Sequence, residues 1–169
     1  MAVCPILLYP DPILKSTSKP IRHDDPGATT IIQAMLDTLQ ASPGVALAAP
    51  QIGHPVQIIA IDVSRTQGER GHGLVVLLNP RIVDGGNRRI IREGCLSVPD
   101  YTGNVLRYGH VVVEGIAPEG QTVTLITSGL EALAFQHEID HLAGVLFLDR
   151  IETLSTDLFR RMKGNGPQS

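Results

Sequence analysis

His137, Glu138 and His141 form an HExxH motif, which in a helix can bind a metal ion. Side chains four residues apart project from one helix face, so the two imidazoles can share one ion. From its place beside the first histidine, the carboxylate of Glu138 can reach a water held at the metal and act as a general base. The alternative is that the three side chains simply fall on a half-buried helix face. Burying them without partners would be costly, and a metal removes that cost.

The third ligand decides which class of site this is, because a catalytic tetrahedral site commonly has three protein ligands and one open position. No histidine follows His141, and Phe147 stands where a metzincin would have its third histidine. Glu152 follows too closely to match the distant glutamate of the gluzincins. Upstream, the thiolate of Cys95 could complete a Cys/His/His site. The alternative for a lone cysteine is a small buried hydrophobic residue, which is the more frequent case.

A helix must hold the two histidines in place, and the surrounding residues predict one. Leu130 and Leu133 recur at spacings of three and four with the histidines, which places them on the same face. Ser128 and Glu131 match a capping box, in which the serine hydroxyl and the glutamate carboxylate bind each other's backbone N–H groups. The helix should therefore start at Ser128 and end near Gly144.

The remaining elements are one earlier helix and a series of strands. Residues 26–42 have helical periodicity, with Asp24 or Asp25 as a start signal. Strands are expected at 56–63, 74–78, 89–98, 105–115 and 122–126, separated by Gly, Pro and Asn, and a short amphipathic segment at 156–163. Without strict β–α alternation, this order predicts an α+β fold with antiparallel sheets packed around the central HExxH-bearing helix.

Length and composition favour one soluble domain over residues 1–169, with residues 164–169 as a loose tail. The chain has 169 residues, 43% of them hydrophobic, which is enough for a core of its own. The net charge of -3 and the absence of a Lys/Arg cluster give no signature of nucleic-acid or membrane binding. No apolar run approaches the roughly 20 residues that span a bilayer. Cys4 and Cys95 are expected to stay reduced.

Three segments together resemble the motifs of the peptide deformylase family. Residues 44–51 (GVALAAPQ) are similar to its first motif, residues 93–97 (EGCLS) to its second and residues 136–141 (QHEIDH) to its third. Similarities at 9–12 (YPDP) and 78–80 (LNP) extend the resemblance over nearly the whole chain. The resemblance implies an enzyme that hydrolyses the N-formyl group from the N-terminal formylmethionine of nascent polypeptides and releases formate.

By this resemblance the metal ligands are Cys95, His137 and His141. The implied cofactor is one divalent ion per chain, Fe2+, with Zn2+, Ni2+ or Co2+ as alternatives, because the ligand set alone does not select the metal. Glu93 and Arg107 are candidates for an ion pair that holds the cysteine segment, and a solvated pair is the alternative.

The resemblance also implies the catalytic groups. Glu138 handles the proton, while the side-chain amide of Gln51 and the backbone N–H of Leu96 stabilise the oxyanion that forms during hydrolysis. The methionine side chain needs an apolar pocket, and an extended substrate could add as a strand along the backbone of the first two motifs. The candidate substrate-binding residues are Gly44, Val45, Ala46, Gly94 and Leu133.

Ala46 stands where the family usually has a second glycine. If this backbone requires a positive φ, the alanine is strained, whereas in an extended strand it is harmless. Two alternatives to the deformylase function follow from the sequence. A zincin-like metallopeptidase would leave Cys95 and Gln51 unexplained, and a non-catalytic deformylase-like binding protein is motivated only by Ala46. The expected partners are a formyl-methionyl nascent peptide and the ribosome, for a monomer in the cytoplasm or in an organelle with bacterial-type translation.

Overall fold

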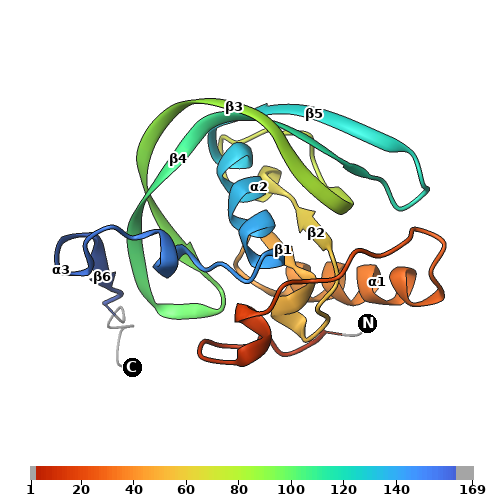
Figure 1. Cartoon of the computed structure of the whole chain (residues 1–169), viewed down its shortest axis with the longest axis horizontal. Coiled ribbons are helices and arrows are strands. Elements are labelled where there is room, and N and C mark those ends of the chain that lie inside the picture. Colours follow the sequence, from red (N-terminus) through yellow and green to blue (C-terminus); the bar gives the residue numbers. More distant parts are fainter. Residues whose placement is uncertain (1–2, 163–169) are drawn as a thin grey trace.

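One antiparallel sheet curves around the helix that carries the HExxH motif. A computed structural model describes residues 3–162, and in it helix α2 (Gly129–Leu142) lies inside the curve of the sheet (Figure 1). The strands within these residues are β1 (Ala46–Ala48), β2 (Ile58–Ile61), β3 (Val75–Cys95), β4 (Val98–Ile116), β5 (Thr122–Ser128) and β6 (Leu158–Arg160). Their order is β1-β2-β3-β4-β5, with β6 also paired to β4, and all pairs are antiparallel. The predicted α+β class is confirmed.

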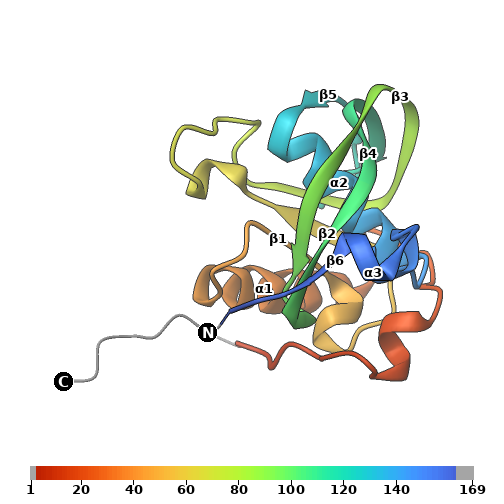
Figure 2. The ribbon, with the colours of Figure 1, turned by 90° about the vertical axis from the view of Figure 1, so that its left-hand side faces the viewer.

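The sheet separates two apolar layers, one under each helix. Helix α1 (Pro26–Ala41) begins at Asp25, whose side chain accepts a hydrogen bond from the Gly27 N–H, so the predicted start signal is confirmed. Along β2, Ile58 packs in the layer that contains α1 and Ile59 in the layer that contains α2. This alternation is the period of two expected for a strand buried on both faces, and Figure 2 shows β1 and β2 between the two helices.

Strands β3 and β4 form one long hairpin, which differs from the shorter strands predicted. A turn of Leu96 and Ser97 joins them, and Cys95 pairs with Val98. The sequence predicted separate strands on either side of Asn79-Pro80 and Gly85-Gly86. A shift in register accommodates Asn79 and Pro80, whereas the two glycines pair directly with Val111 and His110. Bulges can accommodate a proline in this way, because the partner strand continues to supply hydrogen bonds on either side.

The capping box predicted for α2 is wrong. Ser128 is the N-cap residue, but its side chain makes no capping hydrogen bond. The Glu131 carboxylate instead accepts hydrogen bonds from the Thr127 hydroxyl, at 2.5 Å, and from the His72 backbone N–H, at 2.7 Å. The helix also ends at Leu142, two residues before Gly144. The carboxylate therefore anchors the loop before β3, which projects from the sheet (Figure 2).

The amphipathic segment expected at 156–163 is divided between two short elements. A single helical turn, α3 (Leu154–Asp157), is followed directly by β6, which pairs with residues 101–103 of β4. The open edge of β4 thus takes up residues 158–160 as a strand. The end of that segment, at Lys163, and the expected tail at 164–169 lie outside the described residues.

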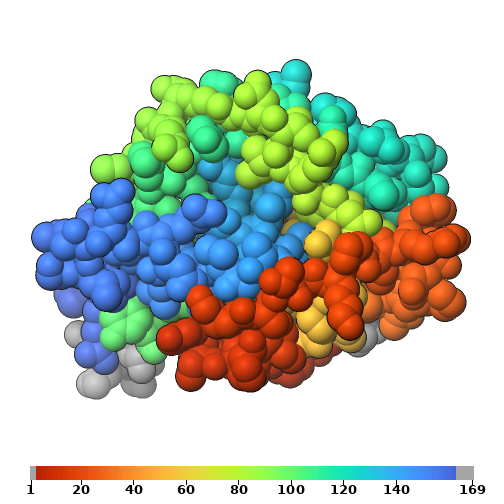
Figure 3. All heavy atoms as spheres, viewed as in Figure 1, coloured from red at the N-terminus to blue at the C-terminus, as the bar shows by residue number. Residues whose placement is uncertain are grey.

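The N-terminal and C-terminal parts of the chain meet on one face. Figure 3 shows the first residues, in red, packed beside the C-terminal part, in blue. The Ser18 N–H donates a hydrogen bond of 2.8 Å to the Leu142 carbonyl in this region. Short 3-10 helices lie in the connections: η1 (Pro12–Lys15), η2 (Ala49–Ile52), η3 (Val63–Arg65) and η4 (Phe147–Arg150). No helix among residues 3–162 is long and apolar enough to cross a membrane.

Candidate metal centre and active site

Cys95, His137 and His141 form the one cluster of potential metal ligands found among the described residues. Cys95 is the last residue of β3, and the two histidines lie one turn apart on α2. Their ligand atoms all lie within 4.8 Å of one another, and the Cys95 Sγ is 3.3 Å from the His141 Nε2. The imidazole centroids are 4.9 Å apart. The structure thus brings together the three ligands expected from the sequence.

The chemistry of this cluster fits a divalent cation. A thiolate and two imidazoles are a common donor set for zinc and for other transition metals. Burial lowers the pKa of His141 well below 6.5, which favours the neutral, ligating form. Burial also acts to lower the pKa of His137, but hydrogen bonds to Cys95 and Glu93 raise it well above 6.5. The surroundings therefore favour the neutral form of His141, whereas Cys95 and Glu93 favour positive charge at His137.

A buried carboxylate fixes the orientation of His137. Its Nδ1 lies 3.2 Å from the Glu93 Oε1, which leaves Nε2 for the cluster. Burial acts to raise the pKa of Glu93, but His137 and Arg107 together hold it below 4.5. The predicted pair of Glu93 and Arg107 is present and buried, with an N–O distance of 3.0 Å. Arg107 is therefore a structural cation beneath the site rather than a solvated surface charge.

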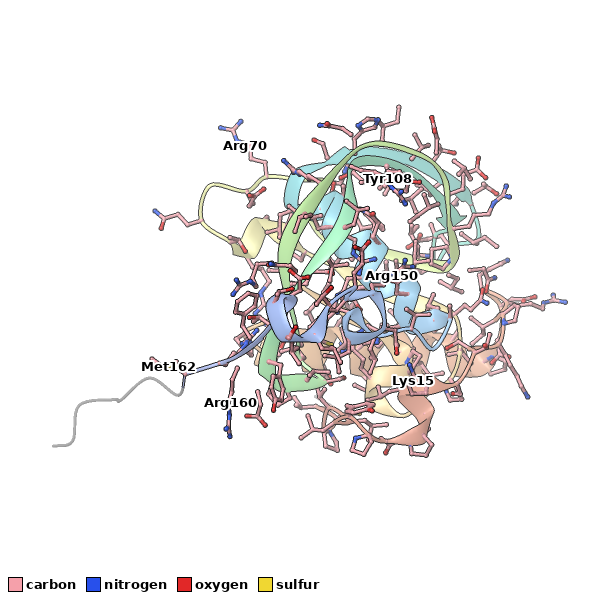
Figure 4. The ribbon with its side chains drawn as sticks, turned by 60° about the vertical axis from the view of Figure 1, so that its left-hand side comes forward. Lys15, Arg70, Tyr108, Arg150, Arg160 and Met162 are labelled. Atoms are coloured by element: carbon pink, nitrogen blue, oxygen red, sulfur yellow. The ribbon has the colours of Figure 1, made fainter. Side chains whose placement is uncertain are left out.

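Asp140 extends this buried ion network, a role that was not predictable from the sequence. It lies inside the HExxH motif but accepts hydrogen bonds from Arg107, at 2.7 Å, and from Arg150, at 2.6 Å. Arg150 lies close to this part of the helix (Figure 4). The network connects β3, β4, α2 and η4, so it holds the ligand-bearing elements against one another.

Glu138 is buried beside the ligands, and one of its carboxylate oxygens makes no hydrogen bond within the described residues. Its side chain is 3% exposed, and Oε2 has no hydrogen-bond partner among the described residues. Burial raises its pKa to about 7. A carboxyl group with a pKa near neutrality can both accept and return a proton, which is the requirement for a general base that later acts as an acid.

The Gln51 amide points its NH2 group at the cysteine. Its Oε1 accepts a hydrogen bond of 2.9 Å from the Ala48 N–H, which sets the orientation of the amide. Its Nε2 then lies 3.1 Å from the Ser97 Oγ and 3.7 Å from the Cys95 Sγ. Leu96 follows Cys95 directly and borders the same cleft. Both expected oxyanion-stabilising residues are thus next to the ligand cluster.

A cleft of about 540 Å³ opens onto this cluster. It is bordered by β1 and the residues before it, by the end of β3 and by the first turns of α2. All five expected substrate-binding residues line it, and the sequence analysis missed several others. The lining residues expected from the sequence are Gly44, Val45, Ala46, Gly94 and Leu133, and those missed include Pro43, Thr66, Ile91, Arg92, Pro99, Leu130, Ala134 and Arg161.

Ala46 does not strain the backbone. It lies in β1, paired with Ile61, and the non-glycine residues with positive φ in the described chain are Asn79 and Asn87. The glycine with a packing requirement in this motif is Gly44, because a Cβ there would approach the Leu96 side chain to 2.8 Å. Alanine is therefore tolerated at position 46, where the family usually has glycine, whereas position 44 requires glycine for packing.

Arg65 positions the wall of the cleft, and its role could not be read from the sequence. Its guanidinium donates hydrogen bonds to the carbonyls at the end of α1 and just after it. These carbonyls belong to Leu39 (2.7 Å), Gln40 (3.4 Å), Ser42 (2.9 Å) and Gly44 (2.8 Å). Positive charge at a helix C-terminus is favourable, and here it also fixes the segment that leads into β1.

Comparisons with known proteins point to a single family. The family model described as "Polypeptide deformylase" matches residues 3–157. A peptide deformylase from Syntrophobacter fumaroxidans is 42% identical over 161 residues, which are 95% of this chain and 94% of that protein. The crystal structure of a peptide deformylase from Legionella pneumophila has a TM-score of 0.83 and 37% identity, covering 90% of this chain and 88% of the other. A Met-Ala-Ser-bound class I type b peptide deformylase from Acinetobacter baumannii has a TM-score of 0.81 and 31% identity, covering 89% and 100%.

Proposed function

The chain belongs to the peptide deformylase family, and on this basis we propose that its active site is the cleft around Cys95, His137 and His141. The protein is a metal-dependent hydrolase that removes the N-formyl group from the N-terminal formylmethionine of nascent polypeptides and releases formate. The observation that best supports this location is that residues from three separate motifs border one cleft. These motifs are about 40 residues apart in the chain, so only folding brings them together.

Cys95, His137 and His141 would hold one divalent ion per chain, Fe2+, with Zn2+, Ni2+ or Co2+ as alternatives. When bound, the ion supplies Lewis-acid chemistry, polarising a carbonyl group and lowering the pKa of water. The close approach of the Cys95 Sγ to the His141 Nε2 and the support of His137 by Glu93 favour this ligand set. Elemental analysis after anaerobic purification would identify the metal.

Glu138 is the group that moves the proton. Hydrolysis adds the hydroxyl of water to the formyl carbon and breaks the bond between that carbon and the methionine nitrogen. Glu138 takes the proton of the attacking water and returns it to the leaving amine, so formate and a free N-terminus result. Its pKa near neutrality suits both steps, since the carboxylate must first accept and the acid must then donate.

Gln51 and Leu96 stabilise the negative charge that develops on the formyl oxygen. The Gln51 amide is oriented in advance by Ala48, so its NH2 group is held toward Cys95 before the reaction begins. The Leu96 backbone N–H would be the second donor, in the turn that directly follows Cys95. Donors fixed in a buried site are worth more than the same donors in water.

The substrate would bind as an extended strand. Leu130 and Leu133 on α2 and Val45 beside β1 provide apolar surface for the methionine side chain. Residues 91–94 of β3 pair with β4 on one edge, and within residues 3–162 no strand pairs with their other edge. The substrate main chain can add to that edge at Gly94 and leave the later side chains in solvent, which tolerates many sequences. The tripeptide bound to the Acinetobacter baumannii relative is consistent with such a ligand.

We also propose the domain organisation, the oligomeric state and the location of the protein. Residues 1–169 would form one catalytic domain, because the apolar clusters adjoin through shared strands. The protein would act as a monomer on nascent chains near the ribosome, in the cytoplasm or in an organelle with bacterial-type translation. The extended conformation of Ala46 removes the reason for proposing a non-catalytic binding protein.

Formate release from formyl-Met-Ala-Ser by the anaerobically purified, ferrous-loaded protein tests this proposal. Turnover should stop on chelation and return when the metal is added back. A fully metallated protein that releases no formate would contradict the proposed function. Cleavage of N-blocked casein in place of formyl peptides would favour an endopeptidase instead.

A further inference from the structure

The guanidinium of Arg161 covers Gly94 at the edge of the cleft. Strand β6 pairs Arg160 with Tyr101, and the Arg161 N–H continues the pairing with a hydrogen bond of 2.8 Å to the Asp100 carbonyl. A Cβ on Gly94 would collide with the Arg161 Nη2 and would lie 3.3 Å from its Cζ. The side chain therefore reaches across the face of the hairpin into the cleft, although Arg161 directly follows β6, which pairs with the other strand of the hairpin.

A second guanidinium lies beside it. Arg92 precedes Gly94 by two residues on β3, so its side chain leaves the same face of the sheet. Its Cζ lies 3.4 Å from the centre of the Phe159 ring, and its Nε donates a hydrogen bond of 3.0 Å to the Asn104 Oδ1. These contacts hold Arg92 toward β6, and both Arg92 and Arg161 line the cleft.

Neither arginine is neutralised by the part of the chain that the structure describes. No carboxylate among residues 3–162 lies within 4.0 Å of either guanidinium, although several other arginines are paired in this way. The carboxylates that line the cleft are Glu93 and Glu138, both buried, and Glu93 is already paired with Arg107. The rim near Gly94 therefore carries two positive charges that face incoming peptide.

We propose that Arg161, supported by Arg92, is a specificity-determining residue that favours formyl peptides with Asp or Glu in the two positions after formylmethionine. This inference rests on the proposed function, in which the substrate main chain runs along Gly94. An extended peptide on that edge carries its second and third side chains past the rim of the cleft. A carboxylate there can pair with the planar fork of the guanidinium.

The test compares acidic peptides with their neutral isosteres. The substrates are formyl-Met-Asp-Ser and formyl-Met-Asn-Ser, and formyl-Met-Ala-Asp and formyl-Met-Ala-Asn, all amidated so that no terminal carboxylate competes. For a partly solvated ion pair, kcat/KM should favour the acidic member of at least one pair by about two- to five-fold. The ratio should fall to about one in Arg161→Ala. In Arg161→Glu, the preference should reverse toward peptides that carry lysine at the same position.

Arg160→Ala is the matched control, because it removes the same charge from the neighbouring position. Arg160 does not line the cleft; together with Asp100, Arg161 and Met162 it borders a separate hollow, and Figure 4 shows it near Met162. Arg160→Ala should keep the wild-type ratio of kcat/KM between the acidic and the neutral peptides. An equal loss in Arg160→Ala, or an unchanged ratio in Arg161→Ala, would overturn the proposal. Normal turnover of formyl-Met-Ala-Ser without any acidic preference would overturn the proposed preference but leave the proposed function intact. If no formyl peptide were turned over, the proposed function would be overturned as well.

Discussion

The Nδ1 atom of His137 lies 3.2 Å from the Oε1 atom of Glu93, which is itself paired with the buried Arg107. This contact determines which ring nitrogen of His137 faces Cys95, and it raises the basicity of that nitrogen as a ligand. The metal site therefore depends on residues that do not touch the metal.

Glu93→Gln should weaken metal binding by about 10- to 100-fold, because it keeps the shape of the side chain but removes its charge. Competition with a chromophoric chelator measures the affinity, and circular dichroism shows what fraction is folded. Glu114→Gln is the control, since Glu114 pairs with Arg81 in an exposed ion pair on the same hairpin. Wild-type affinity in folded Glu93→Gln would refute the positioning role.

Glu138→Gln should retain the metal and lose about 10²- to 10⁴-fold in kcat, because the amide cannot accept the proton of the attacking water. Metal content and turnover are measured on the same preparation. Cys95→Ser is the contrasting variant: it should lose the bound metal, because it removes a ligand, and turnover should fall as a result. Substantial turnover in Glu138→Gln would mean that another group moves the proton.

Gln51→Ala should lower kcat by about 10²- to 10³-fold with little change in KM, because its NH2 group would stabilise charge that appears only in the transition state. Steady-state kinetics at matched metal content measure the effect. Gln121→Ala, at an exposed turn before β5, should behave as the wild type. A change confined to KM would instead indicate a role in ground-state binding.

Ala46→Gly should leave turnover nearly unchanged and lower the free energy of unfolding by about 0.5 to 1 kcal/mol, because glycine loses more entropy in a strand. Gly44→Ala should raise KM, since its Cβ would press on Leu96 in the wall of the cleft. Urea unfolding and formate-release kinetics distinguish the two variants. A large gain of activity in Ala46→Gly would show that the alanine impairs the site.

Glu131 should contribute to stability above pH 4.5 and lose that contribution in acid. Burial acts to raise its pKa, but hydrogen bonds from Thr127 and His72 hold it below 4.5. A carboxyl group whose pKa is lower in the folded state stabilises the fold above its unfolded pKa, and the effect disappears as the pH falls through the folded pKa. Urea unfolding between pH 3 and pH 7 should show a shallower acid dependence in Glu131→Gln. An unchanged dependence would mean that other carboxylates dominate.

The sequence predicted the parts of the site that depend on local spacing. The two histidines of α2 share a face because they are four residues apart, and the resemblance to the family added Cys95 and Gln51. Contacts between distant segments were not predictable. Arg65, Arg161 and the anchoring of Glu131 by His72 depend on where loops and strand edges meet after folding. The continuous hairpin of β3 and β4 was missed because its bulges tolerate residues that usually end strands.

The most direct test of the central claim, that these motifs meet around one metal ion, is X-ray absorption spectroscopy of the anaerobically purified, ferrous-loaded protein. It should find one sulfur and two imidazole nitrogens among the ligands of a single iron, and the sulfur contribution should disappear in Cys95→Ser. A metal shell without sulfur in the wild type, or with the same sulfur contribution in Cys95→Ser, would contradict the proposed site.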